Sequence, residues 1–296
     1  MTRGYVPLML LIALIWGASY LFIKVAVEEM SPAVMVLLRL VLASIVLVGY
    51  LGTREGFAQT GRALRATWRD GLMLGTINAA IPFTLIAWGE QHVDSGVAAI
   101  ANATVPLFTV LLAIRFLPTE RATGWRLAGI ALGLVGVGVL AGLNPRGGWW
   151  AVAGTLAVVV ASISYAGGGL FVQRRLDWVS TPILATASML GASVILLPLA
   201  LASLPSHVPS WKALGSVAAL GIAGTGFAQV VYYRLVRDYG SSRSSLVTYL
   251  LPPTALIYGV LLLREPLTLP ELAGLGLILV GVAFGSGLLL GRTPPA

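Results

Sequence analysis

The sequence contains no cysteine and only two histidines. The absence of cysteine excludes disulfides, Cys-ligated zinc, iron–sulfur clusters and thiol catalysis. Both histidines, His92 and His207, fall near the ends of predicted helices, so a His-rich metal site is excluded too. We therefore expect neither a bound metal nor another cofactor.

Charged residues are scarce as well. They make up 10% of the 296 residues, whereas apolar residues make up 57%. Soluble domains carry about 25% charged residues. No soluble fold buries this much apolar surface, so the surroundings of the chain must be mostly lipid.

Apolar runs of about 18 to 23 residues recur along the chain, and each can cross about 30 Å of hydrocarbon as a helix. The first run is too long for a signal-peptide core, so we expect it to remain in the mature protein. The longest connecting segment, 52–70, has the pattern of an amphipathic interfacial helix, and no segment could hold a soluble catalytic domain. We predict an all-α membrane protein with ten transmembrane helices, at residues 5–27, 32–51, 71–89, 94–115, 124–142, 149–171, 181–203, 212–235, 242–263 and 270–290.

Arginine and lysine are distributed unevenly between the two sides that these helices define. Ten crossings put both termini on one side, and the segments of that side hold 14 of these residues, against 4 on the other. The positive-inside rule therefore predicts cytoplasmic termini. The net charge of +8 then serves as an orientation signal. Lipid head groups are its expected partner, and we expect no binding to nucleic acid.

The chain also contains an internal repeat with a period close to half its length. The segments 120–137 and 265–282 share identical residues at matched positions that include Glu120/Glu265, Thr123/Thr268, Leu127/Leu272, Ala128/Ala273, Gly129/Gly274, Val135/Val280, Gly136/Gly281 and Val137/Val282. The match extends upstream with small gaps, pairing Ser31-Pro32 with Thr181-Pro182, residues 21–24 with 170–173, Ser95 with Ser241, and Pro106 with Pro252.

This repeat predicts two halves, residues 1–145 and 146–296, of five helices each. Because five is odd, the second half enters the membrane from the opposite face, and the halves form an inverted repeat. That architecture is typical of secondary transporters, whose binding site lies near the midplane between the halves. The turns that precede Glu120 and Glu265 have diverged, so we do not expect strictly symmetric gating.

The motifs resemble the drug/metabolite transporter superfamily, in its ten-helix EamA-type branch. They are a Pro in the fourth helix of each half, Glu-x-x-Thr at the next turn, and a fifth helix with Ala-Gly and Val-Gly-Val; Trp16-Gly17-Ala18-Ser19 with Lys24 resembles the first helix. The resemblance covers nearly the whole chain and extends to bacterial amino-acid exporters. It implies an inner-membrane exporter of amino acids or similar small metabolites that works by alternating access. It also implies a cavity surrounded by helices 1, 3, 4, 6, 8 and 9.

Polar and aromatic residues deep in those helices are the candidate substrate-binding residues. An amino acid needs donors and acceptors for its charged groups, and aromatic walls accept varied side chains. The alternative is interhelical hydrogen bonding or an interfacial aromatic belt, which competes most strongly for Trp88 and Tyr233 near helix ends. The candidates are Trp16, Tyr20, Asn78, Asn102, Tyr165, Gln229, Tyr233, Thr248 and Tyr249.

Arg39, Lys24 and Glu90 are the candidates for a gate or an ion pair. Arg39 lies about seven residues into the second helix, about 10 Å deep at 1.5 Å per residue, and intramembrane charge is expensive. We expect it to pair with an outer-face acid, either as a gate or as a structural tie. No deep carboxylate is apparent in the sequence, which argues against a strongly cationic substrate and weakly against proton coupling through a buried acid.

The repeated acids and glycines have simpler interpretations. Glu120 and Glu265 fit acids that stabilise the start of the next helix, and Thr268-x-x-Glu271 reads as a capping box. Glycines four residues apart on the fifth and tenth helices fit close packing within one chain, so we favour a monomer over a dimer.

Two other classes of function are considered. An intramembrane enzyme would need a cluster of nucleophile, base or metal ligands at one depth, and a channel would need a ring of repeated polar residues. The sequence contains neither, so we expect no enzymatic activity. Within transport, the alternative is export of drugs or other metabolites, including nucleotide-sugar-like ones, with proton coupling left open.

Overall fold

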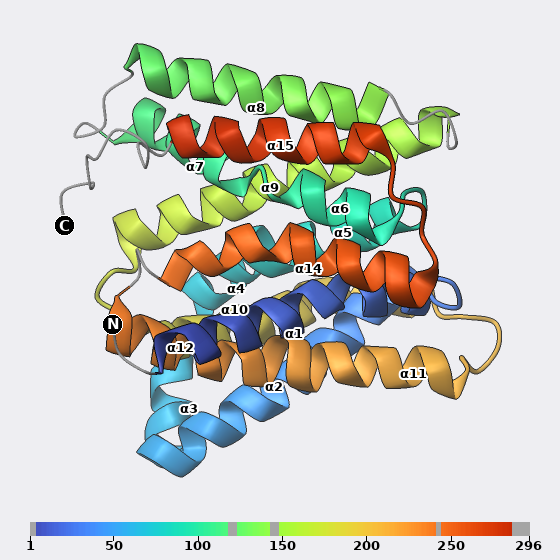
Figure 1. Ribbon diagram of the computed structural model, residues 1–296. Coiled ribbons are helices and arrows are strands. Elements are labelled where there is room, and N and C mark those ends of the chain that lie inside the picture. The colour runs from blue at the N-terminus through green and yellow to red at the C-terminus, as the bar shows by residue number, and fades with distance from the viewer. Residues whose placement is uncertain (1–3, 118–122, 143–147, 241–243, 286–296) are drawn as a thin grey trace.

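The computed structural model describes residues 4–117, 123–142, 148–240 and 244–285, and all regular secondary structure in these ranges is helical (Figure 1). The first half contains α1 (Tyr5–Ala26), α2 (Pro32–Glu55), α3 (Phe57–Ala66), α4 (Trp68–Gly75), η1 (Thr76–Ala80), α5 (Ile81–Glu90), α6 (Ser95–Asn102), α7 (Val105–Phe116) and α8 (Gly124–Gly142). The second half contains α9 (Gly148–Arg175), α10 (Thr181–Ala202), α11 (Trp211–Ala218), η2 (Ala219–Phe227), α12 (Ala228–Tyr239), η3 (Ser245–Leu250), α14 (Leu251–Tyr258), η4 (Gly259–Leu263) and α15 (Leu269–Gly285).

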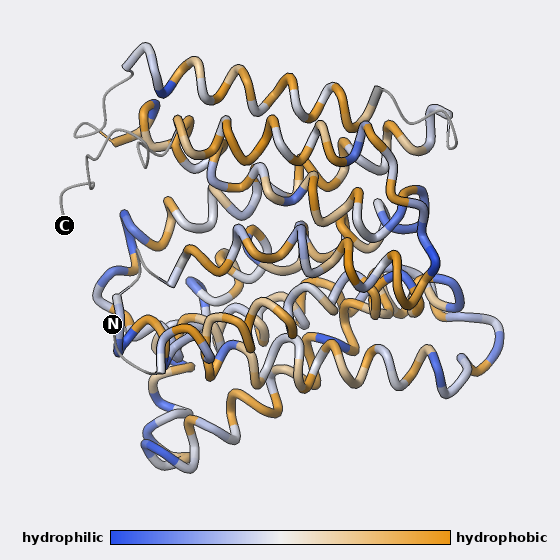
Figure 2. Tube along the Cα trace, in the orientation of Figure 1, coloured by the Kyte–Doolittle hydropathy of each residue, from blue (hydrophilic) through white to orange (hydrophobic). Residues whose placement is uncertain are grey.

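These elements form ten membrane-spanning helices. Within the described ranges, nine spans have at least 18 residues and are apolar enough to cross a membrane, and α15 adds a shorter apolar helix. The prediction of an all-α membrane protein with ten helices is confirmed. The start of α1 and the end of α15 lie on the same side of the bundle in Figure 1, as an even number of crossings requires. Hydrophobic residues follow the lengths of the helices, and hydrophilic ones gather mainly near the two ends of the bundle (Figure 2).

Local chemistry sets where several helices begin and end. Ser31 caps the start of α2, where its hydroxyl accepts a hydrogen bond from the Val34 amide at 3.3 Å, and Pro32 follows at the first helical position. Gly56, with φ of 87°, ends α2 and turns the chain into the short helix α3. The amphipathic helix expected between residues 52 and 70 is therefore α3, and all of its residues but Thr60 are at least partly exposed.

Equivalent helices of the two halves share the same irregularities. The third span of each half contains a π-helical segment, η1 in the first half and η2 in the second. The fourth span of each half changes geometry just before its proline: α6 ends before Pro106, and a 3-10 segment, η3, precedes Pro252. π-Segments and broken helices free backbone groups, and in membrane proteins they are tolerated where they line a cavity.

The fifth and tenth helices, α8 and α15, lie side by side at one edge of the bundle (Figure 1). A Cβ atom built on Gly281 would lie 2.6 Å from the Gly129 carbonyl oxygen and 2.6 Å from the Gly133 amide nitrogen. A Cβ on Gly129 would likewise meet the Gly285 amide at 2.5 Å. The repeated glycines therefore bring these two backbones together within one chain.

Candidate functional site

A partly enclosed cavity of about 320 Å³ lies between the two halves. Residues from four spans of the first half and four of the second line it. Ligand pockets for small molecules typically measure about 300 to 1,000 Å³. The cavity is therefore at the small end of the range that accommodates metabolites.

Eight of the nine predicted substrate-binding residues line this cavity: Trp16, Tyr20, Asn78, Asn102, Tyr165, Gln229, Thr248 and Tyr249. Tyr233 does not line it. That residue lies one turn beyond Gln229 on α12, where it is 8% exposed and its hydroxyl finds no hydrogen-bond partner in the described part of the chain. It belongs to the apolar core, because a step of one helical turn carries its ring past the end of the cavity.

Asn102 is the centre of a hydrogen-bond chain at the break in the fourth span. Its Nδ2 donates to the Tyr20 hydroxyl at 2.9 Å. The Ser162 hydroxyl approaches its Oδ1 at 3.3 Å and the Val158 carbonyl oxygen at 3.1 Å. Asn102 thus joins α1, α6 and α9, so it connects the two halves at the wall of the cavity.

Arg39 also lines the cavity, although it was expected to pair with an acid. Its side chain is largely buried, its Nε donates to the Thr225 Oγ1 at 2.8 Å, and its Cζ lies 4.0 Å from the centre of the Phe83 ring. Within the described residues, no carboxylate oxygen lies within 4.0 Å of its nitrogens. The predicted ion pair of Arg39 with an outer-face acid is therefore wrong, because a neutral hydroxyl and an aromatic face occupy its surroundings instead.

Lys24 and Glu90 lie away from the cavity and do not pair with Arg39. The Lys24 Nζ donates to the carbonyl oxygens of Glu90 and Val93, at 2.7 Å each, and so stabilises the end of α5. Glu90 has no exposed surface, and within the described part of the chain neither of its carboxylate oxygens has a hydrogen-bond partner. It is the last residue of α5, one residue beyond the predicted span 71–89, and its complete burial could not be inferred from the sequence.

Three hydrogen-bonded ties join the two halves at the end of the bundle where α1 and α5 finish. Glu265 accepts from the Ser95 amide at 2.8 Å and from the Ser95 hydroxyl at 2.6 Å, at the start of α6. Glu29 accepts from the amide and hydroxyl of Ser210, the N-cap of α11. The third tie joins the hydroxyls of Ser31 and Ser203, 2.9 Å apart.

These ties revise the interpretation of the repeated acids. Glu265 caps a helix of the other half and does not cap α15, the helix that follows it. Glu271 makes the expected capping-box contact, since its Oε2 accepts from the Thr268 amide at 3.2 Å. Glu120 lies outside the described residues. The hydrogen bonds from Ser210 lower the pKa of the Glu29 carboxyl, because they favour its charged form.

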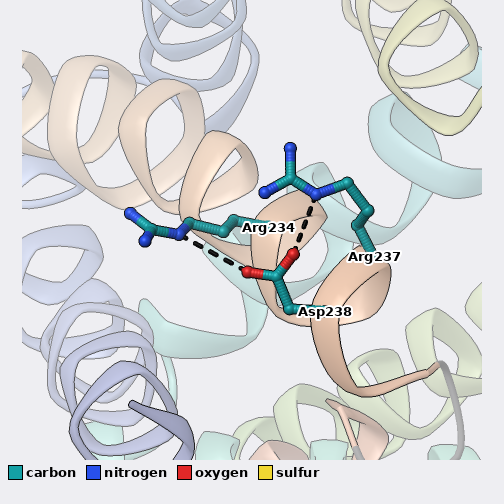
Figure 3. A network of polar contacts seen from close by, with 3 residues as sticks. All are labelled: Arg234, Arg237 and Asp238. Atoms are coloured by element: carbon teal, nitrogen blue, oxygen red, sulfur yellow. Dashed lines mark hydrogen bonds and ion pairs between the residues drawn. The ribbon is translucent and has the colours of Figure 1, made fainter.

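A different arrangement of arginine is found on the opposite end of the bundle. Near the end of α12, the Asp238 carboxylate accepts a hydrogen bond from Arg237 Nε at 2.8 Å. Its other oxygen forms an ion pair with Arg234 Nε at 3.6 Å (Figure 3). Both arginine side chains are about two-thirds exposed. Exposed pairs of this kind contribute little to stability, because both charges stay solvated. This network is a surface feature, whereas Arg39 is a buried cation with no counter-ion among the described residues.

The sequence interpretation missed several cavity residues, among them Phe83, Thr225 and Met189. Phe83 follows the irregular segment η1 and Thr225 lies within η2, and such segments shift the register that a regular helix would predict. The sequence contained one indication that Met189 lines the cavity. The repeat that pairs Ser31-Pro32 with Thr181-Pro182 also pairs Arg39 with Met189, so a cavity position in the second helix implied one in the seventh.

Comparison with known proteins agrees with this architecture. The EamA-like transporter family matches residues 3–142 and 152–286. The inner membrane transporter YedA of Escherichia coli K12 is 30% identical over 91% of this chain and 86% of its own length. A probable terminal-alkyne amino-acid exporter of Streptantibioticus cattleyicolor is 29% identical over 94% and 91%, respectively. A probable amino-acid metabolite efflux pump of Escherichia coli K12 is 27% identical over 95% and 94%.

A solved crystal structure has the same fold, with a TM-score of 0.66 over 99% of this chain and 100% of that one, at 20% sequence identity. The family and its named relatives are transporters and not enzymes, in agreement with the expectation from sequence. The apolar helices of this chain and its inner-membrane relatives show that the protein is a multi-pass bacterial inner-membrane protein. The chain belongs to the EamA-like transporter family.

Proposed function

We propose that the protein exports amino acids, or similar small zwitterionic metabolites, by alternating access of the central cavity. The observation that carries this proposal is the cavity itself, to which both halves contribute polar and aromatic side chains. Two relatives are named for the export or efflux of amino acids or their metabolites, which supports the same class of substrate. The positive-inside distribution of arginine supports cytoplasmic termini.

Alternating access requires contacts between the halves that form on one side and break when that side opens. The ties of Glu265 to Ser95, Glu29 to Ser210 and Ser31 to Ser203 all join residues of 1–145 to residues of 146–296 at one end of the bundle. With cytoplasmic termini, this end faces the periplasm. We infer that these ties hold the outer side closed, and that they separate when the cavity opens outward.

The glycines of α8 and α15 pack against each other within one chain, so we also infer that the monomer is the transporting unit. Each half corresponds to one repeat, with the boundary near residue 145. Rocking of one repeat against the other needs two arrangements of similar energy, and related sequences packed in opposite orientations provide them.

The substrate class is tested by uptake of labelled neutral amino acids into proteoliposomes, with and without an imposed proton gradient. We expect saturable uptake, and its response to the gradient decides between uniport and proton coupling. If folded protein transports no neutral amino acid, the amino-acid assignment is wrong. A parallel panel of drugs and nucleotide sugars then tests the alternative substrates.

Alternating access is tested by locking the outer side. The chain contains no cysteine, so the double variant Ser31→Cys/Ser203→Cys has only two thiols, at positions whose hydroxyl oxygens lie 2.9 Å apart. We expect oxidation to stop uptake and reduction to restore it. The two single variants are the matched controls, and oxidation should leave them active. Full transport by the oxidised double variant would exclude opening at this side.

A further inference from the structure

We propose that Arg39 binds the carboxylate of the transported molecule, so that the cavity selects small metabolites with a free carboxylate. This inference rests on the proposed transport function and assigns the group that orients the substrate. It replaces the interpretation of Arg39 as half of an ion pair.

The guanidinium of Arg39 is held in a defined orientation. The Thr225 hydroxyl donates its proton to the Leu220 carbonyl oxygen at 2.9 Å, so toward Arg39 it acts as the acceptor of the 2.8 Å hydrogen bond from Nε. The Phe83 ring lies against the guanidinium, 4.0 Å from its Cζ. One edge and one face of the group are thus occupied by the protein, and Arg39, Thr225 and Phe83 all line the cavity.

The remaining donors of Arg39 are available to a ligand. A guanidinium has five N–H donors in a planar fork. Within the described residues, only the Nε donor has a protein partner, so the four donors on the two terminal nitrogens have none. A planar pair of N–H donors matches the two oxygens of a carboxylate, and such bidentate pairs are among the strong hydrogen bonds in proteins.

The charge balance of the cavity points to the same ligand. Among the described residues that line it, Arg39 is the one with a charge, and none is an aspartate or glutamate. A buried cation without a counter-ion is costly. An anionic group that enters with the substrate supplies the missing charge. The ammonium of an amino acid would meet only neutral oxygens and aromatic faces, such as those of Asn78, Gln229 and Trp16, so we expect the carboxylate to dominate recognition.

The test compares ligands that differ only in the carboxylate. Binding of neutral L-amino acids, their methyl esters and their decarboxylated amines is measured with purified protein by the ligand-induced rise in unfolding temperature. Benzoate and benzamide are tested as a pair that carries no amine. We expect wild-type protein to bind the amino acids and benzoate, and to bind the esters, the amines and benzamide at least about tenfold more weakly, as expected for lost hydrogen bonds to a charged group.

The matching variants separate a binding role from a structural one. Arg39→Met should weaken amino-acid and benzoate binding about 10- to 100-fold, and Arg39→Lys should fall between, because lysine keeps the charge and loses the fork. Arg234→Met, the same change at an exposed arginine, should bind as wild type. If Arg39→Met does not fold, Arg39→Lys and the ester comparison in wild-type protein still test the proposal.

The outcomes distinguish this inference from the proposed function. If amino acids and their methyl esters bind equally well, Arg39 is not the carboxylate anchor, and amino-acid transport still stands. If benzoate binds and depends on Arg39 while no amino acid binds, the carboxylate site stands and the amino-acid assignment falls. Unchanged carboxylate binding in folded Arg39→Met would overturn the inference by itself.

Discussion

The seam between α8 and α15 and the central cavity are built from the same repeat, but they have diverged to different extents. At the seam, the two helices keep identical residues at several matched positions, Gly129/Gly274 and Gly136/Gly281 among them, and their glycines face one another. In the cavity, residues at matched positions of the two repeats again line the walls, but their residue types differ. The pairs that line it include Trp16/Tyr165, Arg39/Met189, Asn102/Thr248, Ala103/Tyr249, Val105/Leu251 and Pro106/Pro252, and of these only Pro106/Pro252 is identical.

The difference separates two physical demands. Close backbone packing in lipid accepts few residues other than glycine, so both copies of the seam retain them. A binding cavity needs symmetry in its position, because both halves must enclose it, but it does not need symmetry in its chemistry. Arg39 opposite Met189 puts the positive charge on one side only, which would orient an asymmetric ligand.

Breaking the seam should have the largest effect. Gly281→Ala introduces a Cβ atom 2.6 Å from backbone atoms of Gly129 and Gly133. Overpacking of this kind destabilises by about 1 to 3 kcal/mol, so we expect a lower unfolding temperature in detergent. Gly276→Ala on the same helix is the matched control, because nothing lies within 4 Å of its Cβ position. Equal stability of the two variants would mean that the seam does not require glycine.

Replacing Asn102 or Thr248, the polar pair of the fourth spans, by alanine tests the asymmetry of the cavity. Asn102→Ala removes the donor to Tyr20 and the acceptor near Ser162. Losing buried hydrogen bonds costs about 1 to 3 kcal/mol, so we expect the uptake rate to fall about tenfold or more. Thr248→Ala at the equivalent position should have a smaller effect, since it removes one hydroxyl. Equal losses would show that the two sides of the cavity contribute alike.

Glu90 has no equivalent acid in the second half, where the register that pairs Ser95 with Ser241 places Val236. Its carboxyl group is fully buried and has no hydrogen-bond partner among the described residues. We expect Glu90→Gln to keep or raise the free energy of unfolding, by about 1 kcal/mol, because burying an amide requires neither an unpaired charge nor the uptake of a proton. The exposed Glu28→Gln should leave stability unchanged. A clear loss of stability in Glu90→Gln would indicate that the ionised carboxylate balances the nearby Lys24.

The smallest expected effect concerns the tie of Glu29 to Ser210. Because the folded pKa of Glu29 is lowered, its contribution to the closed outer side is present above the ordinary glutamate pKa of about 4.3 and is lost as pH falls through the folded pKa. Labelling of Ser31→Cys by a membrane-impermeant thiol reagent that reacts at acidic pH measures exposure of that side. We expect more labelling below about pH 4.3, and Glu29→Gln should remove this pH dependence. Labelling that does not change with pH would contradict a role of this tie in closure.

The residues that sequence could identify are those with a local or repeated signal. Asn102 and Thr248 were identifiable because each precedes a proline by four residues in a repeated context, and both line the cavity. Tyr233 is a polar residue on α12, as is the cavity residue Gln229. Its position one turn further along that helix removes it from the cavity. Glu265 was assigned to the helix beside it in sequence, whereas it caps a helix 170 residues away.

The sequence alone determined that the protein lies in the membrane, that it has ten helices in two repeats, and that arginine favours one side. These properties depend on hydrophobic length, charge counts and periodicity, which are local or additive along the chain. Only the tertiary structure decided that Glu90 is buried and that Arg39 meets Thr225, 186 residues away, in a cavity whose described lining includes no acid. Such contacts depend on how separate helices pack and rotate against one another, and no single helix records that information.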